Sequence, residues 1–139
     1  MKQKIVLLVL VLACGVFTGC GGAKVTGKVT FDDGSPLTVG TVNFESGNEL
    51  MIGHIKPDGT YLLVGSGKSS GIPQGSYKVF ISNATEDTDK VHASLHAMVQ
   101  TDRKVQRELV ASKFLSPTTS GLTCDVKGTT TYDIKVSKP

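Results

Sequence analysis

Two histidines four residues apart, His92 and His96, form the clearest candidate for a metal site in the sequence. On a helix this spacing places two imidazoles on one face, where they can bind zinc. The zinc-protease signature also requires a Glu directly after the first His as general base, and Ala93 occupies that position. His54 is distant in the sequence. The pattern therefore favours two surface histidines, with no metal and no other cofactor.

Acidic residues gather at Asp32-Asp33 and in the run TEDTD, Thr85 to Asp89. Calcium takes about six to eight oxygen ligands, usually from a loop with alternating acids, a Gly and a distal Glu. Neither acidic stretch has that pattern. Both are therefore interpreted as solvated loop acids.

The candidate nucleophiles lack partners. No G-x-S-x-G motif is present, and neither Ser70 nor Ser120 has a base at a recognisable spacing. Strand alternation predicts that Cys124 points inward, where it acts as a small apolar side chain. The stretch GSGKSS, 65–70, resembles a phosphate-binding loop, but Leu62 stands where the motif needs Gly. We therefore expect no enzymatic activity.

The N-terminus reads MKQK and then IVLLVLVLACGVF, a short basic region followed by an apolar run. This is the layout of an export signal, and the run is shorter than the about 20 residues that cross a bilayer. Phe17-Thr18-Gly19-Cys20 resembles a bacterial lipobox, which predicts a lipoprotein signal peptide over 1–19 and lipidation of Cys20. Cys14, after Val11-Leu12-Ala13, is a rival site, and a plain secretory signal is a further alternative.

Cleavage before Cys20 leaves 120 residues, of which 20–23 form a lipidated tether and 24–139 one domain. Only Cys124 of the cysteines then remains beside the lipidated one, so no disulfide within the domain is expected. Loss of Lys2 and Lys4 from the 15 basic residues leaves 13 against 12 acidic ones. This near-neutral balance argues against nucleic acid as a partner.

Seven segments show the period-two alternation of half-buried strands. The predicted strands are 24–31, 40–46, 51–56, 60–65 and 76–82, with two more in 120–139 whose inward residues are Leu122, Cys124 and Val126 and then Tyr132, Ile134 and Val136. Turn residues separate them, and Pro57-Asp58-Gly59 is predicted to close a hairpin between the third and fourth. Many short strands with turns between them predict an all-β fold, a β-sandwich.

One segment departs from this period. From Val91 to Leu109 the apolar residues Val91, Leu95, Met98, Val105 and Leu109 fall on one arc of a helix. The spacing predicts a helical insertion of about five turns at 3.6 residues per turn. Asp102 on the same stripe weakens that pattern, and an irregular excursion is the alternative.

The stretches VTGKVTFDDGSPLTVGTVNFES, GHIKPDGTYLLVG and IPQGSYKVFIS resemble the carboxypeptidase regulatory-like domain. The ending LVASKFLSPTTSGLTCDVKGTTTYDIKV is similar to small lipoproteins of planctomycete-type bacteria. The resemblance implies a seven-stranded transthyretin-like or immunoglobulin-like sandwich. A related hydrolase ends in Tyr-Arg-Gly-Ser, whereas this chain ends Val136-Ser137-Lys138-Pro139. In DGTY and QGSY, Tyr61 and Tyr77 follow a turn Gly as the first large inward residue, so we expect both in the core.

These observations predict a non-catalytic, lipid-anchored module of the cell envelope. Its partners are the membrane, through the lipid on Cys20, and an envelope protein or a glycan. Position 21, directly after Cys20, is Gly and not the Asp that retains many lipoproteins in the inner membrane. The outer membrane is therefore favoured. The alternative is a small-ligand carrier of the transthyretin type.

Overall fold

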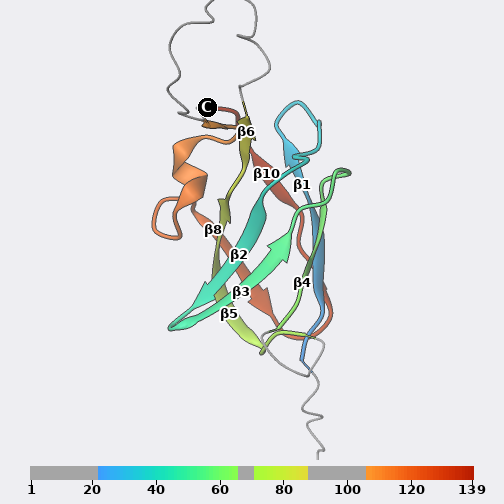
Figure 1. The fold of residues 1–139 in the computed structure, drawn as a ribbon. Helices are drawn as coiled ribbons and strands as arrows, with labels where there is room; N and C mark the ends of the chain where they lie inside the picture. The colour runs from blue at the N-terminus through green and yellow to red at the C-terminus, as the bar shows by residue number, and fades with distance from the viewer. Residues whose placement is uncertain (1–21, 66–70, 88–105) are drawn as a thin grey trace, which may run out of the picture.

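The computed structural model describes residues 22–65, 71–87 and 106–139 (Figure 1). These residues form ten strands and one short 3₁₀ helix. Their bounds are β1 Val25–Phe31, β2 Thr41–Ser46, β3 Glu49–His54, β4 Thr60–Leu63, β5 Gly75–Ser82, β6 Thr85–Asp87, β7 Gln106–Glu108, η2 Ser112–Leu115, β8 Leu122–Val126, β9 Thr130–Thr131 and β10 Ile134–Val136.

Two sheets make up the sandwich. One has the order β10-β1-β4, with β9 also paired to β1, and the other has the order β3-β2-β5-β8. β1 pairs in parallel with β10 and antiparallel with β4, whereas every pair in the second sheet is antiparallel. All seven strands expected from the sequence lie in these sheets. The prediction of an all-β sandwich is confirmed.

The core lies between the sheets and follows the alternation of the sequence. On β5, Tyr77, Val79 and Ile81 are buried, while Lys78 between them is exposed. The ring of Phe44 stands at the centre, with its centroid 6.5 Å from that of Tyr61 and 5.9 Å from that of Tyr77. Burial of each such aromatic side chain stabilises the fold by about 2–3 kcal/mol. Tyr61 and Tyr77 are core residues, as predicted.

The hairpin predicted after β3 forms in part, because its turn closes but its two strands belong to different sheets. The Gly59 amide donates to the Lys56 carbonyl at 2.8 Å, and Gly59 has φ 83°. Yet β3 makes six registered pairs with β2 and β4 makes four with β1, in different sheets. Across the turn, the Lys56 amide donates to the Thr60 carbonyl at 2.8 Å, and Ile52 and Val64 form an isolated antiparallel bridge. The turn reverses the chain, while the registered ladder of each strand lies in its own sheet.

The end of the predicted helix is also wrong. Gln106–Glu108 is strand β7, which pairs antiparallel with β6. The Leu109 amide continues this ribbon by donating to the Ala84 carbonyl at 2.8 Å. Local pairing therefore overrides the helical spacing of the apolar residues here. The remainder of the predicted helix, 91–105, lies outside the described residues.

The sandwich has two distinct ends (Figure 1). At the entry end the chain joins the fold, since Ala23 forms a bridge with Ile72 through reciprocal hydrogen bonds of 2.7 and 2.8 Å. β1 then runs to the far end, where Phe31 is registered with Val136. The β6–β7 ribbon and the C-terminus lie at this far end.

Candidate functional site

Several residues singled out from the sequence lie outside the described part of the structure. They are Cys14, Cys20, His92, His96, Ser70 and the acid at position 89. His54 is described and is exposed at the end of β3. In residues 22–65, 71–87 and 106–139, no group of three or more His, Cys, Asp or Glu side chains could hold a metal ion.

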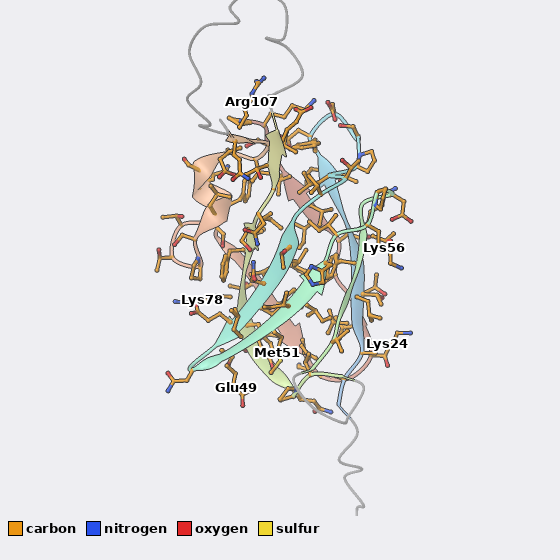
Figure 2. The ribbon with its side chains drawn as sticks, in the orientation of Figure 1. Lys24, Glu49, Met51, Lys56, Lys78 and Arg107 are labelled. Atoms are coloured by element: carbon orange, nitrogen blue, oxygen red, sulfur yellow. The ribbon has the colours of Figure 1, made fainter. Side chains whose placement is uncertain are left out.

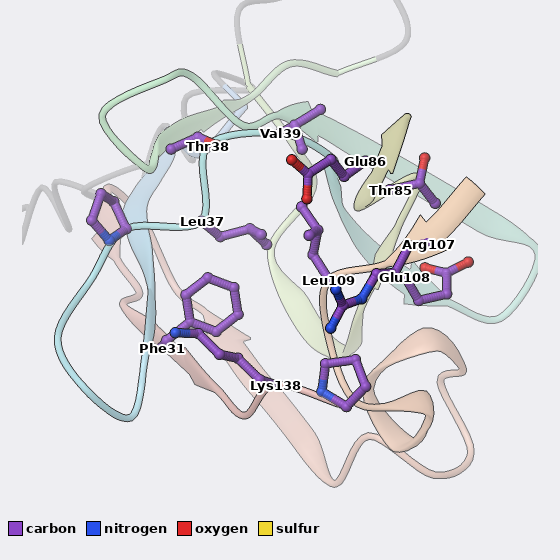
Figure 3. A pocket seen from close by; sticks show the side chains of 12 residues that line it. Phe31, Leu37, Thr38, Val39, Thr85, Glu86, Arg107, Glu108, Leu109 and Lys138 are labelled. Carbon is purple, nitrogen blue, oxygen red and sulfur yellow. The ribbon is translucent and has the colours of Figure 1, made fainter. Parts of the chain in front are cut away.

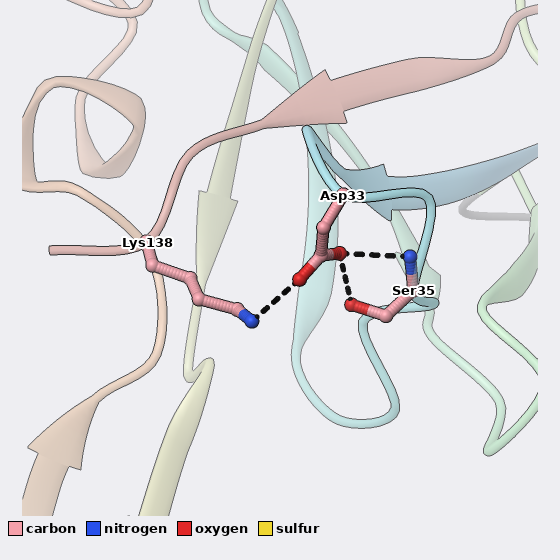
Figure 4. Close-up of polar contacts among 3 residues, drawn as sticks. All are labelled: Asp33, Ser35 and Lys138. Carbon is pink, nitrogen blue, oxygen red and sulfur yellow. Dashed lines mark hydrogen bonds and ion pairs between the residues drawn. The ribbon is translucent and has the colours of Figure 1, made fainter.

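Asp33 has a structural role at the far end (Figure 4). One carboxylate oxygen accepts hydrogen bonds from the Ser35 amide at 2.9 Å and the Ser35 hydroxyl at 2.5 Å. The other lies 2.7 Å from the Lys138 ammonium. The bond from Lys138, followed by those from Ser35, holds the pKa of Asp33 well below its usual range. These contacts fasten the C-terminal tail to the turn after β1.

The two nucleophile candidates among the described residues, Cys124 and Ser120, have structural roles. Cys124 is buried, and burial, with a smaller effect of Asp125, raises the pKa of its thiol. The Ser120 hydroxyl donates to the Val79 carbonyl at 2.5 Å. A buried protonated thiol and a hydroxyl bound to backbone are poor nucleophiles. The prediction that Cys124 faces inward is confirmed.

A groove of about 410 Å³ lies at the far end (Figure 3). Three segments far apart in the sequence line it: the loop after β1, the β6–β7 ribbon and the last two residues. The lining residues are Phe31, Pro36, Leu37, Thr38, Val39, Thr85, Glu86, Arg107, Glu108, Leu109, Lys138 and Pro139.

The groove has an apolar floor and a charged rim. Phe31 and Leu37 are buried beneath it, while Glu86, Arg107 and Glu108 are exposed around it. The ammonium of Lys138 lies 5.1 Å from the centroid of the Phe31 ring, within the range of a cation–π contact. Charges of both signs around an apolar floor suit an extended ligand that has polar groups and some apolar groups. Among the described residues, those that line the groove include no histidine or cysteine.

Sequence reasoning missed this groove. The sequence pattern predicts a loop acid at Glu86 and a helix that includes Arg107 and Glu108. Strands β6 and β7 have three residues each, too few for alternation to reveal them. Glu86 and Arg107 are registered partners. Nothing in their sequence positions indicates that they pair.

A second hollow of about 510 Å³ lies where β2, β5 and β8 run side by side. Glu45, Lys78 and Thr123 form one registered row across these strands. The row offers one acid, one base and one hydroxyl over a flat sheet. It lacks the converging segments that enclose the groove at the far end.

Within the described part of the chain, no helix has the length and apolar character needed to span a membrane. No family model matches the sequence, and no curated protein matches it significantly. A crystal structure of a DUF3823 family protein from Bacteroides ovatus is similar to this chain, with a TM-score of 0.46 and 17% sequence identity. The match covers 84% of this chain and 45% of that one, so the chain spans less than half of that protein.

Proposed function

We propose that this protein is a non-catalytic, lipid-anchored module of the bacterial cell envelope that binds an envelope protein or a glycan. Lipid on Cys20 holds the chain at the bilayer, with 1–19 as the signal peptide, and 24–139 is the binding domain. The groove at the far end is the binding site. The outer membrane is the favoured location, because Gly21 follows the lipidated residue.

The placement of the groove opposite the entry end is the observation that carries this proposal. Cys20 lies three residues before Ala23, and three residues reach at most about 11 Å. The entry end would therefore stay close to the bilayer. Figure 2 shows Lys24 and Arg107 at opposite ends of the molecule. The eight residues of β5 span about 26 Å at 3.3 Å per residue, so the groove would face away from the lipid.

The domain is proposed to be of the carboxypeptidase regulatory-like, transthyretin-like kind. The strands over the stretches that carry the resemblance support this assignment, since β1, β2 and β5 form where the likeness places them. A structural role for Ser120 and Cys124 supports the non-catalytic interpretation.

The alternative function is a small-ligand carrier. The groove volume of about 410 Å³ favours it, because ligand sites commonly measure about 300–1,000 Å³. A carrier would retain a small molecule through purification, which native mass spectrometry would detect. A module that binds a protein or glycan would be purified without one.

The lipid anchor is tested by expressing the full-length chain in a bacterium with labelled palmitate. We expect incorporation that Cys20→Ser abolishes and Cys14→Ser leaves unchanged. Loss of label in Cys14→Ser alone would move the anchor to that residue. Sucrose-gradient separation of the two membranes of the same cells tests the location.

The binding site is tested with a photocrosslinking amino acid at Thr38, which lies exposed on the groove. We expect an adduct in intact cells that Arg107→Glu reduces at least about fivefold, which corresponds to about 1 kcal/mol of binding. The matched control carries the same amino acid at Lys127, which is exposed directly after β8 and away from the groove. Equal adducts at both positions would contradict a role for the groove.

A further inference from the structure

Four large apolar side chains are exposed on two neighbouring strands. Leu50 and Ile52 of β3 are 46% and 42% exposed, and Leu62 of β4 and the adjoining Val64 are 39% and 58% exposed. In the described part of the chain one other large apolar side chain is as exposed, Val39, and it lies at the far end. We name the first four residues the apolar corner.

The apolar corner is continuous. Ile52 and Val64 are partners in the isolated bridge between β3 and β4. Leu50 lies two residues from Ile52, and Leu62 two residues from Val64, so each pair shares the outward side of its strand. Figure 1 shows β3 and β4 side by side. Contiguous exposed apolar surface of this kind marks an interaction site more often than isolated side chains do.

The corner reaches toward the point where the chain enters the fold. β4 pairs antiparallel with β1, with Val25 opposite Leu63 and Thr26 opposite Leu62. The next step of this register places Lys24 opposite Val64, and neighbouring strands lie about 4.8 Å apart. Cys20 precedes Lys24 by four residues, which reach at most about 14 Å.

Positive charge lies beside the corner. Lys28 is exposed on β1, the strand next to β4, and Lys24 is exposed directly before β1. Glu49, at the start of β3, is exposed, and strand alternation puts it on the side of the buried Met51 and not on that of Leu50 and Ile52. Exposed Leu, Ile and Val side chains with lysines nearby match the surface of a bilayer containing anionic lipid.

We infer that the apolar corner rests on the bilayer to which the N-terminal lipid holds the protein. This inference depends on the lipid anchor of the proposed function. The contact would fix the sandwich on the membrane along its β3–β4 side, so that the domain does not turn freely about its short tether. The far-end groove then keeps one orientation relative to the lipid surface.

The experiment uses tryptophan as a depth reporter, because the sequence contains none. The full-length chain carrying Val64→Trp is expressed in a bacterium and purified as the processed lipoprotein. It is then reconstituted into vesicles of phosphatidylethanolamine and phosphatidylglycerol, with or without brominated lipid. Leu50→Trp is a second reporter at the corner, and Val39→Trp is the matched control at the far end.

We expect brominated lipid to quench Val64→Trp and Leu50→Trp by at least about a third, and to leave Val39→Trp unchanged. Adding Ile52→Asp to Val64→Trp should reduce the quenching at least twofold, because a carboxylate at the lipid surface opposes insertion. The mass of the N-terminal peptide of each sample reports acylation independently.

The outcomes separate the two proposals. An acylated protein whose corner reporters are quenched no more than Val39→Trp overturns the inference and leaves the anchor in place. Corner reporters that shift to the blue without quenching, together with crosslinked dimers, overturn it in favour of contact between two copies. A peptide without acyl groups overturns the proposed anchor and this inference with it.

Discussion

The hydroxyl of Tyr61 donates a hydrogen bond of 2.5 Å to the backbone carbonyl of Tyr132. The bond links β4 to the segment between β9 and β10, across strand β1. Both rings also lie against Phe44, whose centroid is 6.0 Å from that of Tyr132. Burial, followed by smaller effects of Cys124, Tyr132 and Asp133, raises the pKa of Tyr61 well above its usual range. The fold therefore requires the protonated phenol.

Stability should fall in alkaline solution because of Tyr61. Its pKa is higher in the folded protein than the value of about 10 in an unfolded chain. Its contribution is thus complete below about pH 10 and is lost as the pH rises above that value. We expect a constant thermal midpoint from about pH 7 to 9 and a decline above it.

Tyr61→Phe separates this effect from general alkaline unfolding. At neutral pH it should lower the free energy of unfolding by about 1–3 kcal/mol, because the Tyr132 carbonyl loses a buried donor. Above about pH 10 its midpoint should decline less steeply than that of the wild type. Part of the slope should remain, since burial also raises the pKa of Tyr77 and Tyr132. Parallel curves for the two proteins would contradict the assignment.

Gly27→Ala should strongly destabilise the sandwich. A Cβ at Gly27 would lie 1.9 Å from the Tyr132 carbonyl oxygen and 2.9 Å from Cε1 of Tyr61. β1 cannot shift away, because it is paired with β4 on one side and with β9 and β10 on the other. We expect a loss of more than about 3 kcal/mol in urea denaturation. Gly128→Ala is the control, since its Cβ would meet nothing within 4 Å; equal losses in both variants would contradict the packing argument.

The sandwich could be predicted from the sequence because its main strands each bury one face. On β5 and β8 the buried side chains recur at every second residue. On β1 all the buried side chains belong to one such row. Turn chemistry likewise predicted the reversal at Gly59. Neither signal shows which strands are hydrogen-bonded neighbours. The sequence therefore could not predict that β3 and β4 belong to different sheets.

The far-end groove was beyond prediction for a related reason. Phe31, Arg107 and Lys138 come together there only because β1 and β10 are parallel and the β6–β7 ribbon lies at the same end. That arrangement depends on topology, which local spacing does not encode. Asp32 and Asp33 are exposed, as the sequence predicts, but local spacing does not indicate that Asp33 also binds Lys138, a partner 105 positions away.

The contact between Asp33 and Lys138 should be visible in an NMR titration. The pKa of Asp33 is lowered in the folded protein. Any contribution of this carboxylate to stability is therefore present above its ordinary pKa of about 3.9 and is lost as the pH falls through the lowered pKa. Lys138→Ala should move the pKa of Asp33 back toward the ordinary value. The pKa of Asp58, which Thr60 lowers through hydrogen bonds, should not change. An Asp33 titration unaffected by Lys138→Ala would contradict the contact.

Cys124 should resist alkylation in the folded protein. Its side chain faces the core and the residue is 5% exposed, and burial raises the pKa of the thiol, so little reactive thiolate reaches solvent. We expect iodoacetamide to leave it unmodified in buffer and to modify it fully in urea, measured by the mass of the tryptic peptide 114–127. The control is Thr123→Cys in a Cys124→Ala background, because Thr123 is exposed on the opposite side of the same strand. That thiol should react in buffer, and equal rates for the two positions would show that β8 does not bury the side the alternation assigns to the core.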